Sequence, residues 1–387
     1  MRPARIALIS SSFDPYPGGV EEHSRQIAVH LKRFGLPVEV WTVDRGEHLG
    51  VRQVDGVTVR YLATPLPNAS AEGVKSFMRD APGAWRAWSD AVANFKPDVL
   101  HVQCFGPNGV YALALALRFR LPLVVSSHGE TMADDHGAFD TSVVLRTTLR
   151  WSLAHAVRVT APSQLVLDDL RARFGLRTPG DVVPNGVEPS FAKRNAATPR
   201  TLPIAEGPTV FAVGRVEWVK GFDLLVRALP LVEPRTTRLV IVGAGGQLDD
   251  LRALAIDLGV DDRVLLTGAL PRTSVIASLP EADVVAVPSR KESFGIVVLE
   301  AWQAGVPLVA TMHGGPGTLV TDGSDGLLAD PENAQSFAAA ISRVLGDPSL
   351  AHHLVEGGRR SVRHFSWTRA TQRYGTIYAR ILQRRAV

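Results

Sequence analysis

The sequence contains a single cysteine, Cys104, among its 387 residues. An internal disulfide is therefore impossible, which excludes the disulfide-stabilised secreted class and favours a reducing, cytoplasmic compartment. No apolar run approaches the roughly 18 residues that a membrane-spanning helix requires. The apolar run near the N-terminus stops at Ser10–Ser12, which is too early for a signal peptide and predicts a first buried strand.

The sequence also has only a small net charge. The formal net charge is +4, with an isoelectric point near 9.4. So small an excess gives no case for nucleic-acid binding, and no recognition motif adds one. It fits an anionic small molecule and an anionic membrane surface equally well. We therefore predict no nucleic-acid partner and keep peripheral contact with the inner membrane face as an alternative.

Several catalytic signatures are missing. The chain has no P-loop, no Gly-x-Ser-x-Gly nucleophile elbow and no Cys/His metal cluster. Asp-x-Asp, the usual carboxylate pair of a metal–diphosphate clamp, does not occur. The glycine-rich run 242–246 is only a partial dinucleotide fingerprint, because Leu248 occupies the third glycine position. These absences weigh against a dehydrogenase and predict a protein without metal or cofactor.

The sequence does contain short apolar runs that alternate with longer amphipathic ones, which predicts βα units with parallel sheets. In the first half the expected strands are Ile6–Ser10, Val38–Val43, Val99–Val102, Leu123–Ser126 and Val157–Thr160. A hairpin partner at Val57–Leu62 and a long helix at Glu72–Phe95 are expected among them. In the second half the strands are Val210–Val213, Leu239–Val242, Val264–Thr267, Val284–Val287 and Leu308–Ala310.

Five prolines interrupt this alternation between residues 184 and 208, which predicts a linker. The expected fold is α/β, with two doubly wound, Rossmann-like domains at 1–190 and 208–365 joined by residues 191–207. The last segment, 366–387, has aromatic residues on one helical face and arginines mostly elsewhere. A helix this amphipathic must cover another part of the protein.

The most informative segment follows the expected strand Val284–Val287, where a loop carries Glu292 and a helix begins near Phe294. The first N–H groups of a helix are unpaired and its dipole is positive there, so phosphate or hydroxyl oxygens bind favourably. Glu300, about two turns into this helix, supplies a second carboxylate. Two such carboxylates can accept hydrogen bonds from sugar hydroxyls. Solvated surface glutamates are the plain alternative, which the apolar neighbourhood makes less favourable.

The turn after Val210–Val213 holds Gly214-Arg215 and, five residues later, Lys220-Gly221. Glycines at a strand–helix turn let the backbone approach a phosphate closely. Arg215 and Lys220 would add a guanidinium fork and a point charge for a diphosphate. A surface turn with two incidental cations explains these residues alone about as well.

Two further candidates lie in the first half. Gly18 and Gly19 come between the first strand and the first helix, where a helix N-terminus can bind an anion or an acceptor. Alone, they would more simply form a tight turn. His128 closes the strand Leu123–Ser126, and strand ends in open α/β sheets line the ligand crevice. A lone histidine is more often structural.

In this order, the residues resemble the family 4 retaining glycosyltransferases of the GT-B fold. Glu292 and Glu300, with seven residues between them, carry the strongest part of the resemblance. The other matches follow the expected order along the chain: Gly18-Gly19 with Glu21 and His23, Pro184–Val187, Gly214-Arg215 with Lys220-Gly221, and the terminal Phe-Ser-Trp…Tyr…Tyr run. The resemblance implies two domains facing a cleft, with the terminal helix crossing back onto the first domain.

The resemblance also implies roles for these residues. Glu292 would bind hydroxyls of the donor sugar and Glu300 those of the ribose. Arg215 and Lys220 would hold the diphosphate, and His128 would lie near the donor sugar. The expected catalytic residues are therefore His128, Glu292, Arg215 and Lys220. The rest of the expected donor-binding set is Gly18, Gly19, Leu270, Ser293, Phe294, Gly295, Ile296 and Glu300. The acceptor-side candidates are His23, Asp134 and Asp135.

Two residues depart from the family pattern. Thr318, in Gly314-Gly315-Pro-Gly-Thr318, stands where the family usually has a glutamate. Trp302 occupies a position that usually holds a smaller apolar residue. The first change leaves the loop geometry open, and the second is expected to alter helix packing.

The sequence thus predicts a metal-independent, retaining hexosyltransferase that uses a nucleotide-sugar donor. A sugar-nucleotide epimerase, a phosphorylase and a non-catalytic nucleotide-sugar-binding protein remain alternatives. We favour a UDP-sugar slightly over a GDP-sugar, because no lysine or acidic side chain stands just after Leu270 to bind guanine. The acceptor hydroxyl is left open among a small polyol, a saccharide and a lipid-linked sugar.

Overall fold

A computed structural model describes residues 2–16, 18–68, 70–132, 137–188 and 207–383. The chain divides into two compact units: unit 1 comprises Met1–Pro184 and Trp367–Val387, and unit 2 comprises Asn185–Ser366. The first division therefore falls a few residues before the predicted boundary at 190. Of the predicted linker 191–207, only Gly207 lies within the described residues.

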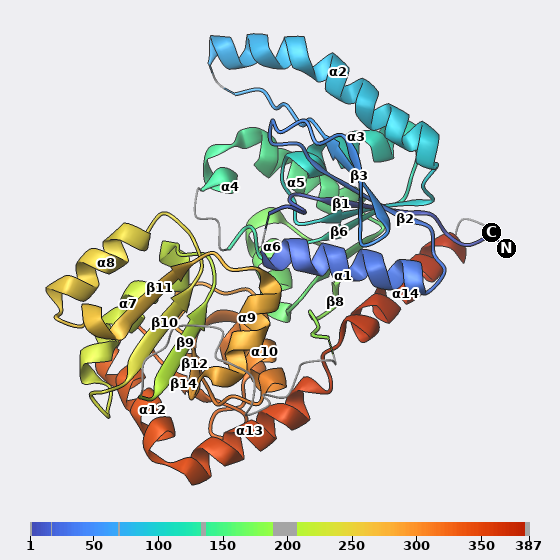
Figure 1. Ribbon diagram of the computed structural model, residues 1–387. Coiled ribbons are helices and arrows are strands. Elements are labelled where there is room, and N and C mark those ends of the chain that lie inside the picture. Colours follow the sequence, from blue (N-terminus) through green and yellow to red (C-terminus); the bar gives the residue numbers. More distant parts are fainter. Residues whose placement is uncertain (1, 17, 69, 133–136, 189–206, 384–387) are drawn as a thin grey trace. The chain divides into compact units, whose positions relative to one another are not determined.

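Unit 1 is built on a sheet with the strand order β3-β4-β2-β1-β5-β6-β7-β8 (Figure 1). The strands are β1 (Ile6–Ser10), β2 (Val38–Val43), β3 (Val51–Val54), β4 (Val57–Leu62), β5 (Val99–Gln103), β6 (Leu123–Ser126), β7 (Arg158–Ala161) and β8 (Asp181–Val182). β3 and β4 form an antiparallel hairpin, whereas the other neighbouring strands run parallel. Strands β1, β5 and β6 are buried throughout, as their unbroken apolar runs predict.

Helices cover both faces of this sheet. They are α1 (Gly19–Arg33), α2 (Ala71–Phe95), α3 (Pro107–Phe119), α4 (Ala138–Thr141), α5 (Val143–His155), α6 (Gln164–Phe174) and α14 (Trp367–Gln383). Alternate residues of β1 point to opposite faces, so Ala7 and Ile9 enter the core under α2, α3, α5 and α6. Ile6 and Leu8 enter a second core under α1 and α14.

The terminal helix α14 lies beside α1 on this second face (Figure 1). Its aromatic residues Trp367, Tyr374 and Tyr378 are each 1% exposed and pack in the same core as Ile6 and Leu8. The amphipathic pattern of the tail is therefore matched by burial on one side of the helix. The covered surface belongs to unit 1, although α14 follows unit 2 in the chain.

Unit 2 has an all-parallel sheet with the strand order β11-β10-β9-β12-β13-β14. The strands are β9 (Thr209–Val213), β10 (Arg238–Val242), β11 (Val264–Gly268), β12 (Val284–Val287), β13 (Leu308–Thr311) and β14 (Leu327–Ala329). The helices are α7 (Phe222–Ala228), α8 (Leu248–Asp257), α9 (Arg272–Ser278), α10 (Ile296–Ala304), α11 (Gly314–Leu319), α12 (Ala334–Gly346) and α13 (Pro348–Val362). Separate apolar cores fill the two faces of the sheet.

Helix α10 begins later than the sequence predicts. Gly295 caps it in a left-handed conformation, with φ at 94°, and Ile296 is its first residue. Glu300 is therefore the fifth residue of the helix, slightly more than one turn from its start rather than two. The shorter distance brings the carboxylate nearer to the positive end of the helix dipole.

The unusual Trp302 of α10 is accommodated by glycine on α13. Its indole N–H donates to the carbonyl of Asp325 at 2.6 Å, and its side chain is 2% exposed. A Cβ added at Gly358 would lie 2.4 Å from the indole ring, far inside contact distance. The expected change in helix packing is thus a large ring on one helix facing a residue without a side chain on the next.

Trp367→Ala should destabilise unit 1 by about 3–5 kcal/mol, because it removes a fully buried indole and leaves a cavity under α14. The matched control is Trp151→Ala on α5, where the side chain is 58% exposed. We expect that control to change the free energy of unfolding by no more than about 0.5 kcal/mol. Urea denaturation measures both, and equal losses would contradict the assigned packing of α14.

Candidate functional site

The strand order of unit 2 reverses between β9 and β12, which neighbour each other in the sheet. Loops that leave the carboxyl ends of two such strands run in opposite directions and leave a crevice where ligands bind in open α/β sheets. The loop after β9 carries Arg215 and Lys220, and the loop after β12 carries Glu292. Two motifs that are far apart in the sequence therefore meet at a position where open α/β sheets favour a ligand.

Arg290 joins these two loops. Its guanidinium donates to both carboxylate oxygens of Asp223, each at 2.7 Å, and to the carbonyl of Trp218 at 3.0 Å. Its backbone N–H donates to the carbonyl of Val219 at 2.9 Å. The guanidinium also stacks over the Trp218 ring at 4.9 Å. Bidentate arginine–carboxylate pairs fix direction as well as distance, so the two loops are held in one register.

This register brings Lys220 to Glu292. The Lys220 Nζ donates to Glu292 Oε2 at 2.5 Å, across 72 residues of sequence. Both side chains are partly buried, at 22% and 15% exposure, so solvent screens the pair only in part. Behind them, the N–H of Gly315 donates to the Glu292 carbonyl at 2.7 Å. A Cβ at Gly314 would lie 2.5 Å from that carbonyl oxygen, which explains the glycine pair.

The partial dinucleotide fingerprint has a packing explanation. A Cβ at Gly243 would lie 1.8 Å from the Gly214 carbonyl oxygen, and one at Gly245 would lie 2.3 Å from the Val216 carbonyl oxygen. The N–H of Val216 donates to the Ala244 carbonyl at 2.9 Å. These glycines therefore let the loop after β10 touch the loop after β9, which helps to hold the Arg215–Lys220 segment in place.

Glu300 is paired with an arginine that the sequence analysis did not select. Its Oε1 lies 2.7 Å from a guanidinium nitrogen of Arg272, and its side chain is only 4% exposed. Arg272 begins α9, two residues after the predicted donor-binding residue Leu270. Leu270 itself packs against the apolar core under α10. The sequence signal that points to Arg272 is its position immediately after Leu270-Pro271, close to the end of a strand.

The remaining donor-side residues form the entry to α10. Phe294 is buried, with its ring 6.2 Å from that of Phe365, and Gly295 supplies the left-handed cap. Ser293 and Ile296 are partly buried on either side. Arg215 is exposed on the loop after β9. The structure thus brings Lys220, Glu292 and the start of α10 together, and Arg215 lies on the same loop as Lys220.

Thr318 does not reach this entry. Its hydroxyl donates to the Gly315 carbonyl at 2.8 Å, within its own helix α11. The residue at the usual glutamate position therefore caps a local carbonyl. The backbone contact between Gly315 and Glu292 persists without a carboxylate there.

Unit 1 has its own reversal of strand order, between β1 and β5. Asn108 joins the ends of these strands by donating to the carbonyls of Ile9 and Cys104, each at 3.1 Å. Gly18, the cap of α1, has extended backbone, and the Glu21 carboxylate folds back over it. With Glu21 and Glu22 in its first turn, α1 already carries negative charge at its positive end. This position suits hydroxyl groups better than a second anion.

His128 lies just after β6 and is partly buried. Its Nε2 is 2.8 Å from Gln103 Oε1, and its backbone N–H donates to Glu130 Oε2 at 2.6 Å. The other Glu130 oxygen accepts from the Phe105 N–H at 2.8 Å, so this carboxylate joins the ends of β5 and β6. Burial, followed by the nearby His23 and His101, lowers the pKa of His128 well below its usual range. The ring is therefore neutral.

His23, an acceptor-side candidate, is fully buried. Its ring packs edge-on against His128 with 4.4 Å between centroids, and its Nε2 is 3.3 Å from the Tyr374 hydroxyl. The amphipathic pattern of α1 did not show this, because a histidine fits either face of a helix. In this position the buried His23 ring packs against His128, and it is not placed for direct contact with an acceptor.

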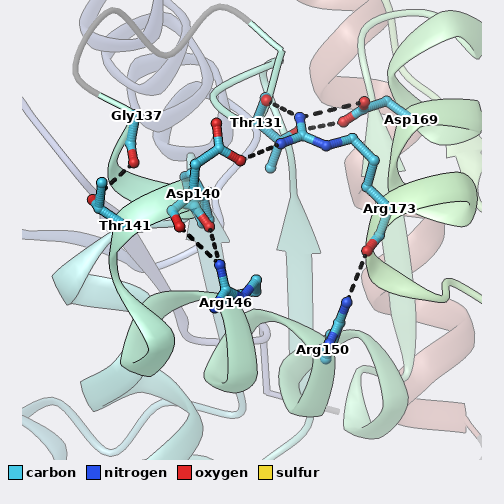
Figure 2. Close-up of polar contacts among 9 residues, drawn as sticks. Thr131, Gly137, Asp140, Thr141, Arg146, Arg150, Asp169 and Arg173 are labelled. Carbon is cyan, nitrogen blue, oxygen red and sulfur yellow. Dashed lines mark hydrogen bonds and ion pairs between the residues drawn. The ribbon is translucent and has the colours of Figure 1, made fainter.

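The other acceptor candidates, Asp134 and Asp135, lie outside the described residues. The segments that flank them are joined by Arg173 of α6 (Figure 2). Its guanidinium donates to the Thr131 carbonyl and, at 3.0 Å, to Asp140. Arg146 donates to the Asp140 carbonyl at 2.9 Å. Both ends of the segment are therefore anchored to the helical layer of unit 1.

Comparison with known proteins agrees with this architecture. A family model described as "Glycosyltransferase Family 4" matches residues 17–191. A second family model, described as "Glycosyl transferases group 1", matches residues 195–361. A D-inositol 3-phosphate glycosyltransferase from Acidothermus cellulolyticus is 32% identical, over 99% of this chain and 92% of its own length. The chain belongs to the family 4 glycosyltransferases.

Other relatives carry different names. A glycogen synthase from Mycobacterium tuberculosis is also 32% identical, over 95% of this chain and 83% of its own length. Among solved structures, sucrose-phosphate synthase from Thermosynechococcus elongatus has a TM-score of 0.82 at 24% identity, with 98% and 99% of the two chains covered. The Anabaena protein HepE in complex with UDP-glucose has a TM-score of 0.78 at 20% identity, with 97% and 99% covered. These structural likenesses establish the GT-B fold of this glycosyltransferase.

Within the described part of this glycosyltransferase, no three His, Cys, Asp or Glu side chains are grouped as ligands for a metal ion. No helix there has the length and apolarity needed to span a membrane.

The buried histidines of this glycosyltransferase predict sensitivity to acid. Burial, with a smaller effect of His23, lowers the pKa of His101 to about 3, against about 6.5 in an unfolded chain. The unfolded state therefore binds more protons between these values, and stability falls as the pH drops below about 6.5. From about pH 6.5 to 5 this one group costs about 2 kcal/mol. Urea unfolding at about pH 7 and 5 should show the loss, in which His128 acts in the same direction.

His101→Gln should remove the part of this acid sensitivity that His101 causes, because a glutamine side chain does not titrate. The control is His155→Gln on α5, where the side chain is exposed, and it should behave like the native protein. Acid sensitivity that is undiminished in His101→Gln would show that the buried ring is not its source.

Proposed function

We propose that this family 4 glycosyltransferase transfers a hexosyl-type sugar from a nucleoside-diphosphate donor to an acceptor hydroxyl, with retention of configuration and without a metal ion. Unit 2 would bind the donor. The observation that carries the proposal is the Lys220–Glu292 pair, which lies between the loops after β9 and β12, just before the N-terminus of α10. Cation, carboxylate and helix end match the three kinds of group on a nucleotide-sugar.

Each part of this site suits one part of the donor. Glu292, with the first N–H groups of α10, would accept from and donate to hydroxyls of the sugar. Glu300, one turn further on, would accept hydrogen bonds from the ribose. Lys220 and Arg215 would stabilise the negative charge that grows on the diphosphate as the glycosidic bond breaks. A metal ion is not needed in this scheme, because the two side chains supply the positive charge.

The groups described at the site support retention. Inversion needs a side-chain base beside the acceptor hydroxyl, on the face opposite the departing diphosphate. The sequence candidate for that base, His23, is fully buried beside His128 and Tyr374. In a retaining transfer, an oxygen of the departing diphosphate can take the acceptor proton on the same face of the sugar. His128 would contribute a hydrogen bond to the substrate.

The names of relatives narrow the substrates. Several relatives at about 28–32% identity are named D-inositol 3-phosphate glycosyltransferases, which supports a small polyol phosphate as acceptor. HepE is described in complex with UDP and with UDP-glucose, which supports a uridine donor. The glycogen synthase name supports a second candidate, transfer to a glucan. We therefore propose UDP-glucose as the donor and an inositol phosphate as the acceptor.

Glu300→Gln should weaken UDP binding, because an amide that is half donor replaces a carboxylate that only accepts. Hydrogen bonds to charged groups contribute about 1.5–3 kcal/mol, so we expect a Kd raised about ten- to a hundredfold in calorimetry. The control is Glu356→Gln on α13, another glutamate 2.7 Å from an arginine but with a side chain that is 42% exposed. UDP affinity that is the same in both variants would refute the ribose role.

The product of an α-linked donor should itself be α-linked. The reaction is run with UDP-glucose and an inositol phosphate in excess chelator, and the coupling constant of the anomeric proton is read by NMR. Turnover in chelator with an α-product is expected. A β-product would refute retention, whereas turnover restored only by added Mg²⁺ or Mn²⁺ would refute metal independence.

A further inference from the structure

Gln103 is a fully buried polar residue at the end of β5, next to the reversal of strand order in unit 1. Its amide lies between two histidines. The nitrogen is 3.3 and 3.2 Å from the two ring nitrogens of His101, and the oxygen is 2.8 Å from Nε2 of His128. A glutamine buried within a sheet must satisfy both ends of its amide, so these contacts fix how it is oriented.

The surroundings favour one orientation of the amide. Its nitrogen is about equally far from both nitrogens of His101, so it faces the ring rather than either lone pair. The face of an aromatic ring is negative and attracts N–H groups, whereas a carbonyl oxygen would be repelled there.

This orientation determines the protonation of His128. A carbonyl oxygen can only accept a hydrogen bond, so Nε2 of the neutral His128 ring carries the proton. Nδ1 is then the acceptor nitrogen of the ring. We propose that Gln103 is a positioning residue, which fixes His128 in the Nε2-protonated form so that Nδ1 can accept a hydrogen bond from a substrate hydroxyl. The proposal rests on the substrate role of His128 given above.

Tyr374 extends this arrangement to the terminal helix. Its hydroxyl bonds to Gln103, lies 3.3 Å from Nε2 of His23 and lies 3.4 Å from the Ser126 hydroxyl. His23 in turn packs edge-on against His128. One hydroxyl of α14 therefore touches both neighbours of His128. The helix that closes the chain also completes the surroundings of a residue more than 200 positions earlier.

The first variant is Gln103→Met, which keeps the length of the side chain but removes the acceptor. We expect kcat with UDP-glucose and an inositol phosphate to fall about three- to tenfold, the usual effect of one neutral hydrogen bond, with little change in the KM for UDP-glucose. Tyr374→Phe should produce a smaller fall in kcat. Its control is Tyr111→Phe, which removes another buried hydroxyl that donates only to the carbonyl of Pro65.

The decisive readout is ¹⁵N NMR of histidine-labelled protein, with the His128 signals assigned by their loss in His128→Asn. The native spectrum should show His128 protonated at Nε2 and unprotonated at Nδ1. Gln103→Met should show a mixture of the Nε2-protonated and Nδ1-protonated forms. A native ring protonated at Nδ1, or a Gln103→Met ring and kcat unchanged from native, would overturn the proposal.

Failure of the proposed function would give different results from failure of the Gln103 proposal. Full turnover by His128→Ala, or no turnover of UDP-glucose by the native enzyme, would remove the substrate role. The NMR measurement would still decide whether Gln103 fixes the ring, because it needs no substrate. An unfolded Gln103→Met protein would leave the native spectrum and Tyr374→Phe to decide.

Discussion

The geometry of unit 2 depends on one ion pair, the bidentate contact between Arg290 and Asp223. Strands β9 and β12 are neighbours in the sheet, but the chain leaves them in opposite directions, so nothing in the sheet itself holds their loops together. Arg290 does so with one side chain, through a carboxylate, a backbone carbonyl and the Trp218 ring. Lys220 can then lie 2.5 Å from Glu292 without either loop losing its backbone contacts. The placement of the donor residues follows from that register.

Unit 1 contains buried polar side chains that need hydrogen-bond partners. His23 of α1, His101 and Gln103 of β5, and His128 after β6 lie close together where water is largely excluded, and burial keeps the His101 and His128 rings neutral. Neutral imidazoles each need one donor and one acceptor, and apolar packing provides neither. The tyrosines of α14 supply hydroxyls that can do both. Their return to unit 1 therefore satisfies polar groups as well as burying apolar surface, which is why the tail combines aromatic bulk with hydroxyls.

Much of this arrangement could be predicted from local patterns. The strands that end near the site were expected within a residue or two, since short apolar runs between amphipathic helices leave few choices. Glu292 and Lys220 were selected because each follows such a strand. Strand β14 was missed, since three residues are too few for a periodic signal. Asp134 and Asp135 remain predictions, because they lie outside the described residues.

What could not be predicted is which side chains pair across distant segments. Nothing local distinguishes Arg272, which pairs with Glu300, from the exposed arginines on many helices. Nor does α1 reveal that His23 is buried, because that depends on a helix more than 300 residues later. The glycines at 243 and 245 imitate part of a dinucleotide fingerprint, since close contact between two loops requires the same residue as close contact with a phosphate. Which side chains pair depends on the fold, whereas the sequence shows only which side chains are able to pair.

The charges around α10 show why these pairings matter for an anionic ligand. Glu292 and Glu300 alone would repel a diphosphate, because two carboxylates near the end of one short helix outweigh its dipole. Lys220 and Arg272 offset them, at 2.5 and 2.7 Å, before any ligand arrives. Arg215 adds a further cation to the loop that carries Lys220. Under the proposed function, the carboxylates would accept from neutral hydroxyls while the cations attract phosphate, so one small site would bind the two chemically opposite halves of a nucleotide-sugar.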